Sequence, residues 1–191
     1  MAFVDPSRFS NPLRRFARSL VPGGEPLVAA PLPLPESLAD EPWYSVGRAV
    51  AALGGSRVDG WCLQEWPGKA LRARFGACWR DPGGRLWNVL PGGETWLFLP
   101  DPQRRYEGAP IAARYLSLQR DALLDDYLKV CGALARPGLD ESAWAPLKQT
   151  GERLEGWLEL GGSGEQACPC RSGKRYRACC SRRLRDSLVG R

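Results

Sequence analysis

Residues 58–90, VDGWCLQEWPGKALRARFGACWRDPGGRLWNVL, contain the pattern that decides the fold class of this chain. They hold three short runs rich in aromatic and β-branched residues, namely Val58–Trp66, Ala70–Trp79 and Arg85–Leu90. Such runs predict strands when turn residues separate them, and Asp81-Pro82-Gly83-Gly84 is a typical hairpin connection. Trp96–Leu99 predicts a fourth strand in the same way. The stretch therefore predicts a small antiparallel sheet.

Apolar residues at helical spacing occur on both sides of this sheet. Before the sheet, the stripe Val46, Val50 and Leu53 predicts a helix, and Gly54-Gly55 is the signal that ends it. After Pro110, one long helix is predicted by the stripe Ala112, Leu116, Leu123, Tyr127, Val130 and Leu134. A further helix is predicted by Ser142 as N-cap and the stripe Leu147, Leu154 and Leu158. We therefore expect an α+β body over residues 41–160, in which helices pack on the sheet.

The segments that flank this body have the composition of connections. Residues 1–40 contain VPGGEPLVAAPLPLPES, whose proline density predicts an extended, weakly ordered arm. The basic start of the arm, with Arg14, Arg15 and Arg18 among Phe9, Leu13, Phe16 and Leu20, predicts either a short docked helix or a frayed terminus. Residues 161–167 begin Gly-Gly-Ser-Gly and predict a flexible linker.

Residues 168–180, CPCRSGKRYRACC, hold four of the seven cysteines of the chain: Cys168, Cys170, Cys179 and Cys180. The first residues of the chain are polar and basic and lack the apolar stretch of an export signal, so we expect a cytoplasmic protein with reduced thiols. In a reducing compartment, clustered thiolates usually bind zinc, which then supplies the folding free energy of a short segment. We therefore expect a zinc-binding mini-domain at residues 168–191, with Ser172 as the N-cap of a short helix that ends at Cys179 and Cys180.

This segment resembles the SEC-C motif, a zinc-binding segment found at the C-terminus of the protein-export motor SecA and in many unrelated bacterial proteins. The family pattern is Cys-x-Cys-x-Ser-Gly, a basic stretch, and then Cys with Cys or His. It is met by Cys168, Cys170, Ser172, Gly173, Lys174, Tyr176, Cys179 and Cys180. Arg171 departs from the pattern, because the family often has Gly there. The resemblance covers about a tenth of the chain and implies a bound Zn²⁺.

The positive charge of the chain is concentrated around these cysteines. Residues 168–191 contain eight Lys or Arg against Asp186 alone, a net charge of +7, although the whole chain carries only +6. A zinc ion with four thiolates carries −2, so part of this excess neutralises the site. We expect the remainder to bind an acidic protein face or ribosomal RNA, as the SecA segment is associated with a chaperone and the ribosome. The predicted partner-binding residues are Lys174, Arg175, Arg177, Arg182, Arg183 and Arg185.

Residues 42–102 resemble a group of uncharacterised bacterial and phage proteins, some with SEC-C tails, that look like papain- or transglutaminase-type thiol enzymes. The resemblance places the catalytic Cys, His and Asp of that group at Pro42 or Trp43, at Gly76 and at Asn88. The chain contains no histidine at all, so the base that activates the thiol is missing together with the nucleophile. The sequence therefore predicts a non-catalytic interaction protein.

Two alternative functions remain open at this stage. A Cys-dependent hydrolase or transferase would use Cys62 or Cys78, although both lie in apolar strands where a free cysteine is usually inert. A nucleic-acid-binding protein would use the basic tail. The carboxylates Asp125 and Asp126 are interpreted as a solvated helix face beside Lys129.

Overall fold

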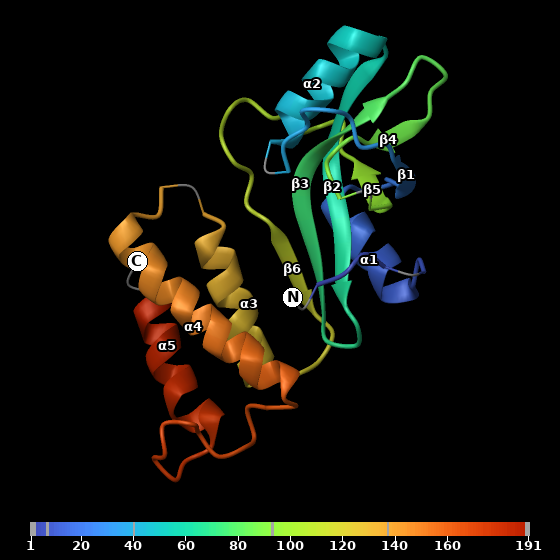
Figure 1. The fold of residues 1–191 in the computed structure, drawn as a ribbon. Coiled ribbons are helices and arrows are strands. Elements are labelled where there is room, and N and C mark those ends of the chain that lie inside the picture. The colour runs from blue at the N-terminus through green and yellow to red at the C-terminus, as the bar shows by residue number, and fades with distance from the viewer. Residues whose placement is uncertain (1–2, 7, 40, 93, 137, 190–191) are drawn as a thin grey trace. The chain divides into compact units, whose positions relative to one another are not determined.

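The computed structural model describes residues 3–6, 8–39, 41–92, 94–136 and 138–189. Its elements are α1 (Asn11–Leu20), β1 (Leu27–Pro31), α2 (Pro42–Leu53), β2 (Ser56–Trp66), β3 (Ala70–Arg80), β4 (Leu86–Asn88), β5 (Trp96–Pro100), β6 (Arg114–Ser117), α3 (Ala122–Leu134), α4 (Glu141–Glu159), the 3₁₀ turn η1 (Tyr176–Ala178) and α5 (Cys180–Val189) (Figure 1). The chain divides into two compact units. We call Phe3–Glu65 with Leu71–Arg114 the barrel unit, and Trp66–Ala70 with Tyr115–Arg191 the helical unit. Residues 7, 40 and 93 of the barrel unit and residues 137, 190 and 191 of the helical unit lie outside the described part.

The four predicted strands are confirmed as β2, β3, β4 and β5, and they belong to one six-stranded sheet. The strand order is β2-β5-β1-β4-β3-β6, and β2 also pairs with β3, so the first five strands close into a small barrel. β2 and β5 are antiparallel, with Cys62 opposite Phe98, whereas β1 and β4 run parallel, with Ala30 opposite Trp87. The predicted α+β class is confirmed, although β1 and β4 run parallel where an antiparallel sheet was expected.

Side chains alternate between the two faces of the strands, as a closed barrel requires. One cluster fills the inward-facing positions: Ala29, Cys62, Cys78, Leu86, Leu90, Trp96 and Phe98. On the opposite face, α1 covers the strands with Leu13 and Phe16, which pack with Trp61 and Leu63 of β2. A second outer cluster joins Val46 and Ala49 of α2 to Ala77, Trp79 and Val89. The alternation therefore builds one internal and two external apolar layers around the same strands.

The expectation of a weakly ordered arm at residues 1–40 needs correction, because α1 and β1 lie in this segment. The basic start forms the docked helix, not a frayed end: Ser10 Oγ accepts a hydrogen bond from Leu13 N at 3.4 Å, and Leu13 is fully buried. β1 lies between β5 and β4, where Val28 pairs with Leu97. Residues 27–31 show neither the helical nor the strand spacing of apolar residues, so the sequence pattern does not indicate β1. Its stability comes from neighbouring strands on both sides, which a local pattern does not reveal.

The helix after Pro110 begins later than its apolar stripe predicts. Arg114–Ser117 forms β6, and α3 begins at Ala122 because Asp121 caps it, accepting hydrogen bonds from Leu123 N and Leu124 N. Similarly, Asp140 caps α4 in place of the predicted Ser142, accepting from Ala143 N at 2.9 Å. In the described part of the chain, no helix is both long enough and apolar enough to cross a bilayer.

Candidate metal centre

The cysteine segment folds as a tight loop followed by a helical turn. Cys168 N donates to Lys174 O at 2.8 Å, and Ala167 forms an antiparallel bridge with Arg175, so the two sides of the loop are joined at its base. The turn η1 then leads to Cys179, and Cys180 is the first residue of α5. Two thiols therefore come from the loop and two from the junction of η1 and α5.

The four sulfur atoms converge on one point. The Sγ atoms of Cys168, Cys170, Cys179 and Cys180 all lie within 4.8 Å of one another, and the Sγ atoms of Cys170 and Cys179 are 3.4 Å apart. A tetrahedral ion with metal–sulfur bonds of about 2.3 Å places its four sulfurs roughly 3.8 Å apart. The donor set therefore fits a metal ion, with Cys168 and Cys179 buried and Cys170 exposed.

Hydrogen bonding and burial shift the pKa values of two of the thiols in opposite directions. Ser172 Oγ lies 3.1 Å from Cys179 Sγ, so this serine contacts the sulfur cluster and is not the N-cap that the sequence predicted. A hydrogen bond with Ser172, followed by bonds with Cys168 and Cys179, lowers the pKa of the Cys170 thiol. Burial, followed by hydrogen bonding with Cys168 and Cys170, raises the pKa of the Cys180 thiol. A bound dication would hold all four as thiolates.

Arg171 has an unusual backbone conformation within the loop. Its φ is 61°, in the left-handed region where a side chain costs about 1–2 kcal/mol and glycine is favoured. This is the position where the SEC-C pattern often has Gly. The departure noted in the sequence thus leaves the thiols in place but introduces local strain into the turn between Cys170 and Ser172.

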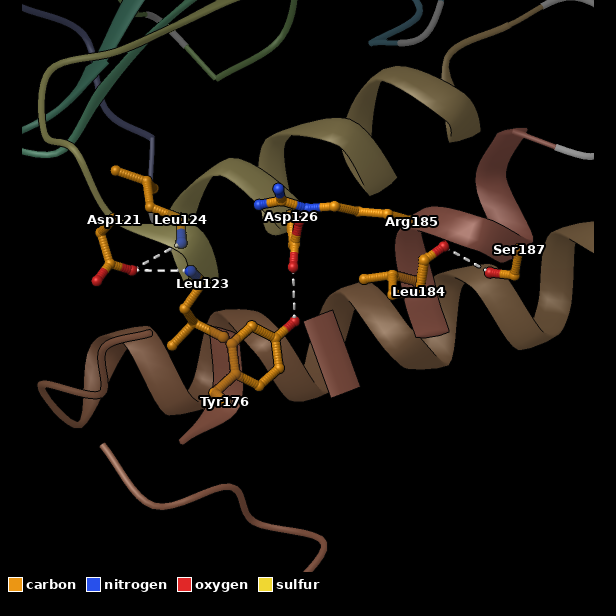
Figure 2. Close-up of polar contacts among 8 residues, drawn as sticks. All are labelled: Asp121, Leu123, Leu124, Asp126, Tyr176, Leu184, Arg185 and Ser187. Carbon is orange, nitrogen blue, oxygen red and sulfur yellow. Dashed lines mark hydrogen bonds and ion pairs between the residues drawn. The ribbon is translucent and has the colours of Figure 1, made fainter. Parts of the chain in front are cut away.

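The cysteine loop is attached to α3 through the carboxylate of Asp126. The side chain of Asp126 is fully buried and accepts a hydrogen bond from Tyr176 Oη at 3.1 Å and one from Arg185 Nε at 2.8 Å (Figure 2). The Tyr176 ring also packs edge-on against Trp157, with centroids 5.3 Å apart. Burial, followed by the charge of Asp126, raises the pKa of Tyr176, so its hydroxyl remains a donor. The interpretation of Asp126 as a solvated carboxylate was wrong, because its helix position faces α5 and η1.

A second aspartate binds the glycine segment before the cysteines. Asp121 uses one carboxylate oxygen to cap α3 (Figure 2). Its other carboxylate oxygen accepts a hydrogen bond from Gly164 N at 2.9 Å. A Cβ at Gly164 would lie 2.9 Å from Ala122 Cβ, so the close approach requires glycine. Residues 161–167 therefore do not isolate the cysteine loop as the predicted linker would; the loop, α3 and α4 belong to one unit. An Asp directly before an apolar helix was the sequence signal for this cap.

The six predicted partner-binding cations fall into two groups. Arg175 and Arg177 both pair with Glu165, at 2.8 and 2.7 Å, and Arg185 pairs with Asp126. Lys174, Arg182 and Arg183 are exposed and have no carboxylate partner among the described residues; Arg171, outside the predicted set, shares both properties. Arg191 lies outside the described residues. Three of the six predicted partner-binding cations are therefore already paired with carboxylates of the chain itself.

The positions that the thiol-enzyme resemblance singled out lie in the barrel unit. Pro42, Trp43 and Gly76 line a hollow of about 170 Å³, together with Cys62. Asn88 lies elsewhere and is buried, where its amide donates to Glu94 O and accepts from Leu90 N. Pro42, Trp43, Gly76 and Asn88 have no nucleophilic or basic side chain, and the thiol in the hollow is that of Cys62.

Cys62 and Cys78, the displaced nucleophiles considered above, are both buried inside the barrel. Burial raises the pKa of Cys62 to about 12 and also raises the pKa of Cys78. Such thiols are almost entirely protonated at neutral pH, which is the inert state of a cysteine.

Comparison with known proteins finds no matching family model, and no curated protein and no solved structure matches the chain. The resemblance to the SEC-C motif therefore rests on the residues of the loop and on the convergence of their four sulfur atoms.

Proposed function

We propose that this protein is a zinc-dependent interaction protein, in which the cysteine loop holds Zn²⁺ and the cations around it bind an acidic protein or ribosomal surface. The observation that carries this proposal is the coincidence of two features in one segment. Four thiols lie within 4.8 Å of one another, and the same segment carries exposed cations that have no carboxylate partner among the described residues.

The choice of zinc follows from the chemistry of the ligands. Four thiolates at tetrahedral spacing suit Zn²⁺, whereas Mg²⁺ and Ca²⁺ prefer oxygen ligands. Cys168, Cys170, Cys179 and Cys180 would hold the ion, which would fix the loop and the start of α5 in place. Zinc with four thiolate ligands has no open position for substrate, so its role here is structural.

The charge of the segment supports an anionic partner. The zinc site with its four thiolates carries −2, and Glu165 and Asp126 are already paired with arginines. Arg171, Lys174, Arg182 and Arg183 exceed what the site needs for neutrality. Guanidinium groups that are exposed and unpaired bind carboxylates and phosphates with paired hydrogen bonds.

A binding role is also preferred to catalysis on chemical grounds. The chain has no histidine, and burial keeps the Cys62 and Cys78 thiols protonated. The Cys-dependent hydrolase or transferase would need a thiolate and, in the papain-like scheme, an imidazole that activates it; burial disfavours the thiolate and the chain contains no histidine.

The metal is tested by measuring zinc in the purified protein by native mass spectrometry. We expect one Zn²⁺ per chain, lost in the Cys170→Ser, Cys180→Ser variant. Cys131→Ser is the matched control, since it removes a thiol from α3 and leaves the loop intact. Equal zinc content in all three proteins would refute the assignment of the ligands.

The partner is tested by affinity capture from native cytosol with the intact protein and the Arg182→Glu, Arg183→Glu variant. The control is Arg8→Glu, Arg15→Glu, which makes the same charge change at exposed residues of the barrel unit. A partner that is retained by wild type and control, released by salt and lost with the α5 variant supports the proposal. Retention by all three proteins would contradict it, and loss on nuclease treatment would favour the nucleic-acid alternative.

A further inference from the structure

A second cationic site lies in the barrel unit. A hollow of about 540 Å³ is lined by the side chains of Arg57, Arg80, Arg104 and Arg105, with Asp59 and Asp101 between them. Pockets that bind small molecules are typically about 300–1,000 Å³. Four arginines against two aspartates leave the lining with a net charge of +2.

Two of the arginines are held in place by buried carboxylates. Arg57 Nη2 donates a hydrogen bond to Asp59 Oδ2 at 3.2 Å, and Arg57 Nε lies 3.1 Å from Asp59 Oδ1 in an ion pair. The Asp59 side chain is only 7 % exposed. Arg104 Nη1 donates to Asp101 Oδ2 at 3.3 Å, and the Asp101 side chain is 3 % exposed. Each guanidinium has five N–H donors, so both arginines retain donors for a ligand.

The two aspartates are themselves fixed by the fold. Asp101 accepts hydrogen bonds from Trp61 Nε1 at 3.0 Å and from Gln103 N at 3.1 Å, and its own N–H donates to Asp59 O. Asp59 Oδ2 also accepts from Tyr106 N at 3.2 Å. The loop that carries Arg104 and Arg105 is therefore anchored to β2 at both ends, and the site is organised before any ligand binds.

The other two arginines have no carboxylate partner in the described part of the chain. Arg80 ends β3 and is half-buried, and Arg105 is exposed. Gly55 has a φ of 81°, and a Cβ there would lie 2.2 Å from Arg80 O, so only glycine brings this part of the chain so close to Arg80. Arg80 and Arg105 thus add unpaired positive charge to a site where the carboxylates are already in use.

We propose that this hollow binds a phosphorylated small molecule of up to mononucleotide size, with its phosphate among the four arginines. The fork of a guanidinium matches phosphate oxygens, and the lining charge of +2 complements a phosphate dianion. The hollow shares no residue with the cysteine loop, and its proposal does not depend on the function proposed above. The volume of the hollow favours a compact ligand over a polymer, which would need a continuous groove.

The test is isothermal titration calorimetry of the full-length, zinc-loaded protein with pyrophosphate, AMP, ADP and citrate at low ionic strength. We expect saturable binding of at least one phosphate compound at one site per chain, and weaker binding of citrate. The Arg80→Gln, Arg105→Gln variant should raise the Kd by about tenfold or more, because two contacts to a charged group are lost. The control, Arg8→Gln, Arg15→Gln, removes the same charge at other exposed positions of the barrel unit and should leave the Kd unchanged.

Three results would overturn the proposal. One is the absence of saturable binding by every phosphate probe at millimolar concentration. Another is an equal loss of affinity in the control variant, which would indicate a general charge effect. The third is binding of a single-stranded oligonucleotide that is tighter than that of every mononucleotide and depends on Arg80 and Arg105, which would identify a nucleic-acid surface. Because the side chains of Arg80 and Arg105 form no ion pair or hydrogen bond with other described residues, their variants should retain the melting temperature of the parent, which is measured alongside.

Discussion

The barrel unit and the helical unit are stabilised by different chemistry. In the barrel unit, apolar and aromatic side chains such as Trp61 and Phe98 are fully buried in layers on both faces of the strands. The helical unit also has an apolar core, which includes Trp66 and Tyr127, but its last segment is attached by a buried carboxylate, Asp126, and by a cluster of thiols. Hydrophobic burial needs no cofactor, whereas thiols need a metal to be held together. Order in the barrel unit therefore comes from apolar burial, whereas we expect the cysteine segment of the helical unit to depend on a bound metal.

Removal of zinc is expected to have the largest effect and to separate the two units. Binding of structural zinc contributes about 10–16 kcal/mol in small zinc peptides at neutral pH, so its loss should unfold the cysteine loop and α5. Through Tyr176 and Arg185, we expect the loss to extend to α3. Hydrogen exchange measured before and after chelation should show faster exchange in these elements and unchanged exchange in β2 and β5. Unfolding of the whole chain would show that the barrel unit also depends on the metal.

Truncation of Phe98 is the converse experiment. Phe98 is fully buried inside the barrel, so Phe98→Ala should lower the free energy of unfolding of the barrel unit by about 3–5 kcal/mol. Zinc content should stay at that of the parent protein. Leu160→Ala is the control, because Leu160 is 88 % exposed and its loss should change stability by less than about 0.5 kcal/mol. Urea unfolding and zinc analysis check both, and a loss of zinc in Phe98→Ala would contradict the separation.

The attachment through Asp126 is tested by a pair of adjacent substitutions. Asp126→Asn removes the ion pair with Arg185 and disturbs the bond from Tyr176, so we expect the helical unit to lose about 1–3 kcal/mol. The lower half of that range is expected, because Arg185 is 41 % exposed and water can solvate it. Asp125→Asn is the control, since it makes the same charge change one residue away. Thermal unfolding of both variants measures the two losses of stability. Equal losses would mean that the change in charge, and not the contacts of Asp126, accounts for the effect.

Relief of the strain at Arg171 should produce a small gain. Arg171→Gly removes the side chain from a residue with a left-handed backbone conformation and should stabilise the loop by up to about 1 kcal/mol. The greater conformational entropy of glycine in the unfolded chain reduces this gain. The readout is the rate at which a chelator removes zinc, which should fall. Arg171→Ala keeps the unfavourable φ but removes the same charge, so it should give no gain. Faster zinc loss from the glycine variant would show that the Arg side chain supports the loop.

The smallest effect is expected for the thiols of the barrel. With a pKa of about 12, Cys62 is ionised in roughly one molecule in ten thousand at pH 8, and the pKa of Cys78 is also raised. Iodoacetamide should therefore leave both residues unmodified in the native, zinc-loaded protein and modify both after denaturation, as peptide mapping would show. The modified fraction should rise with pH, because the thiolate is the reactive form. Rapid native labelling of Cys62 at pH 8 would revive the hydrolase alternative.

The sequence predicted those features that depend on local pattern. The strands around Trp61 and Trp79, the helix that ends at Gly54 and the four cysteines all follow from residue type and spacing. It did not predict β1, because the proline-rich segment owes its order to partners far along the chain. It also did not predict the burial of Asp126, since a helical pattern with an aspartate gives no sign of a tyrosine that binds it.

The parallel pairing of β1 with β4 affects how the protein folds during synthesis. β1 leaves the ribosome early, but its two neighbours in the barrel, β4 and β5, are translated much later. Closing so long a stretch of chain has an entropic cost, and non-local strand pairing of this kind is associated with folding in milliseconds to seconds. Until then the apolar residues of α1 and β1 are exposed on the nascent chain. This interval, before β5 has emerged, is when the N-terminal segment most needs protection from aggregation.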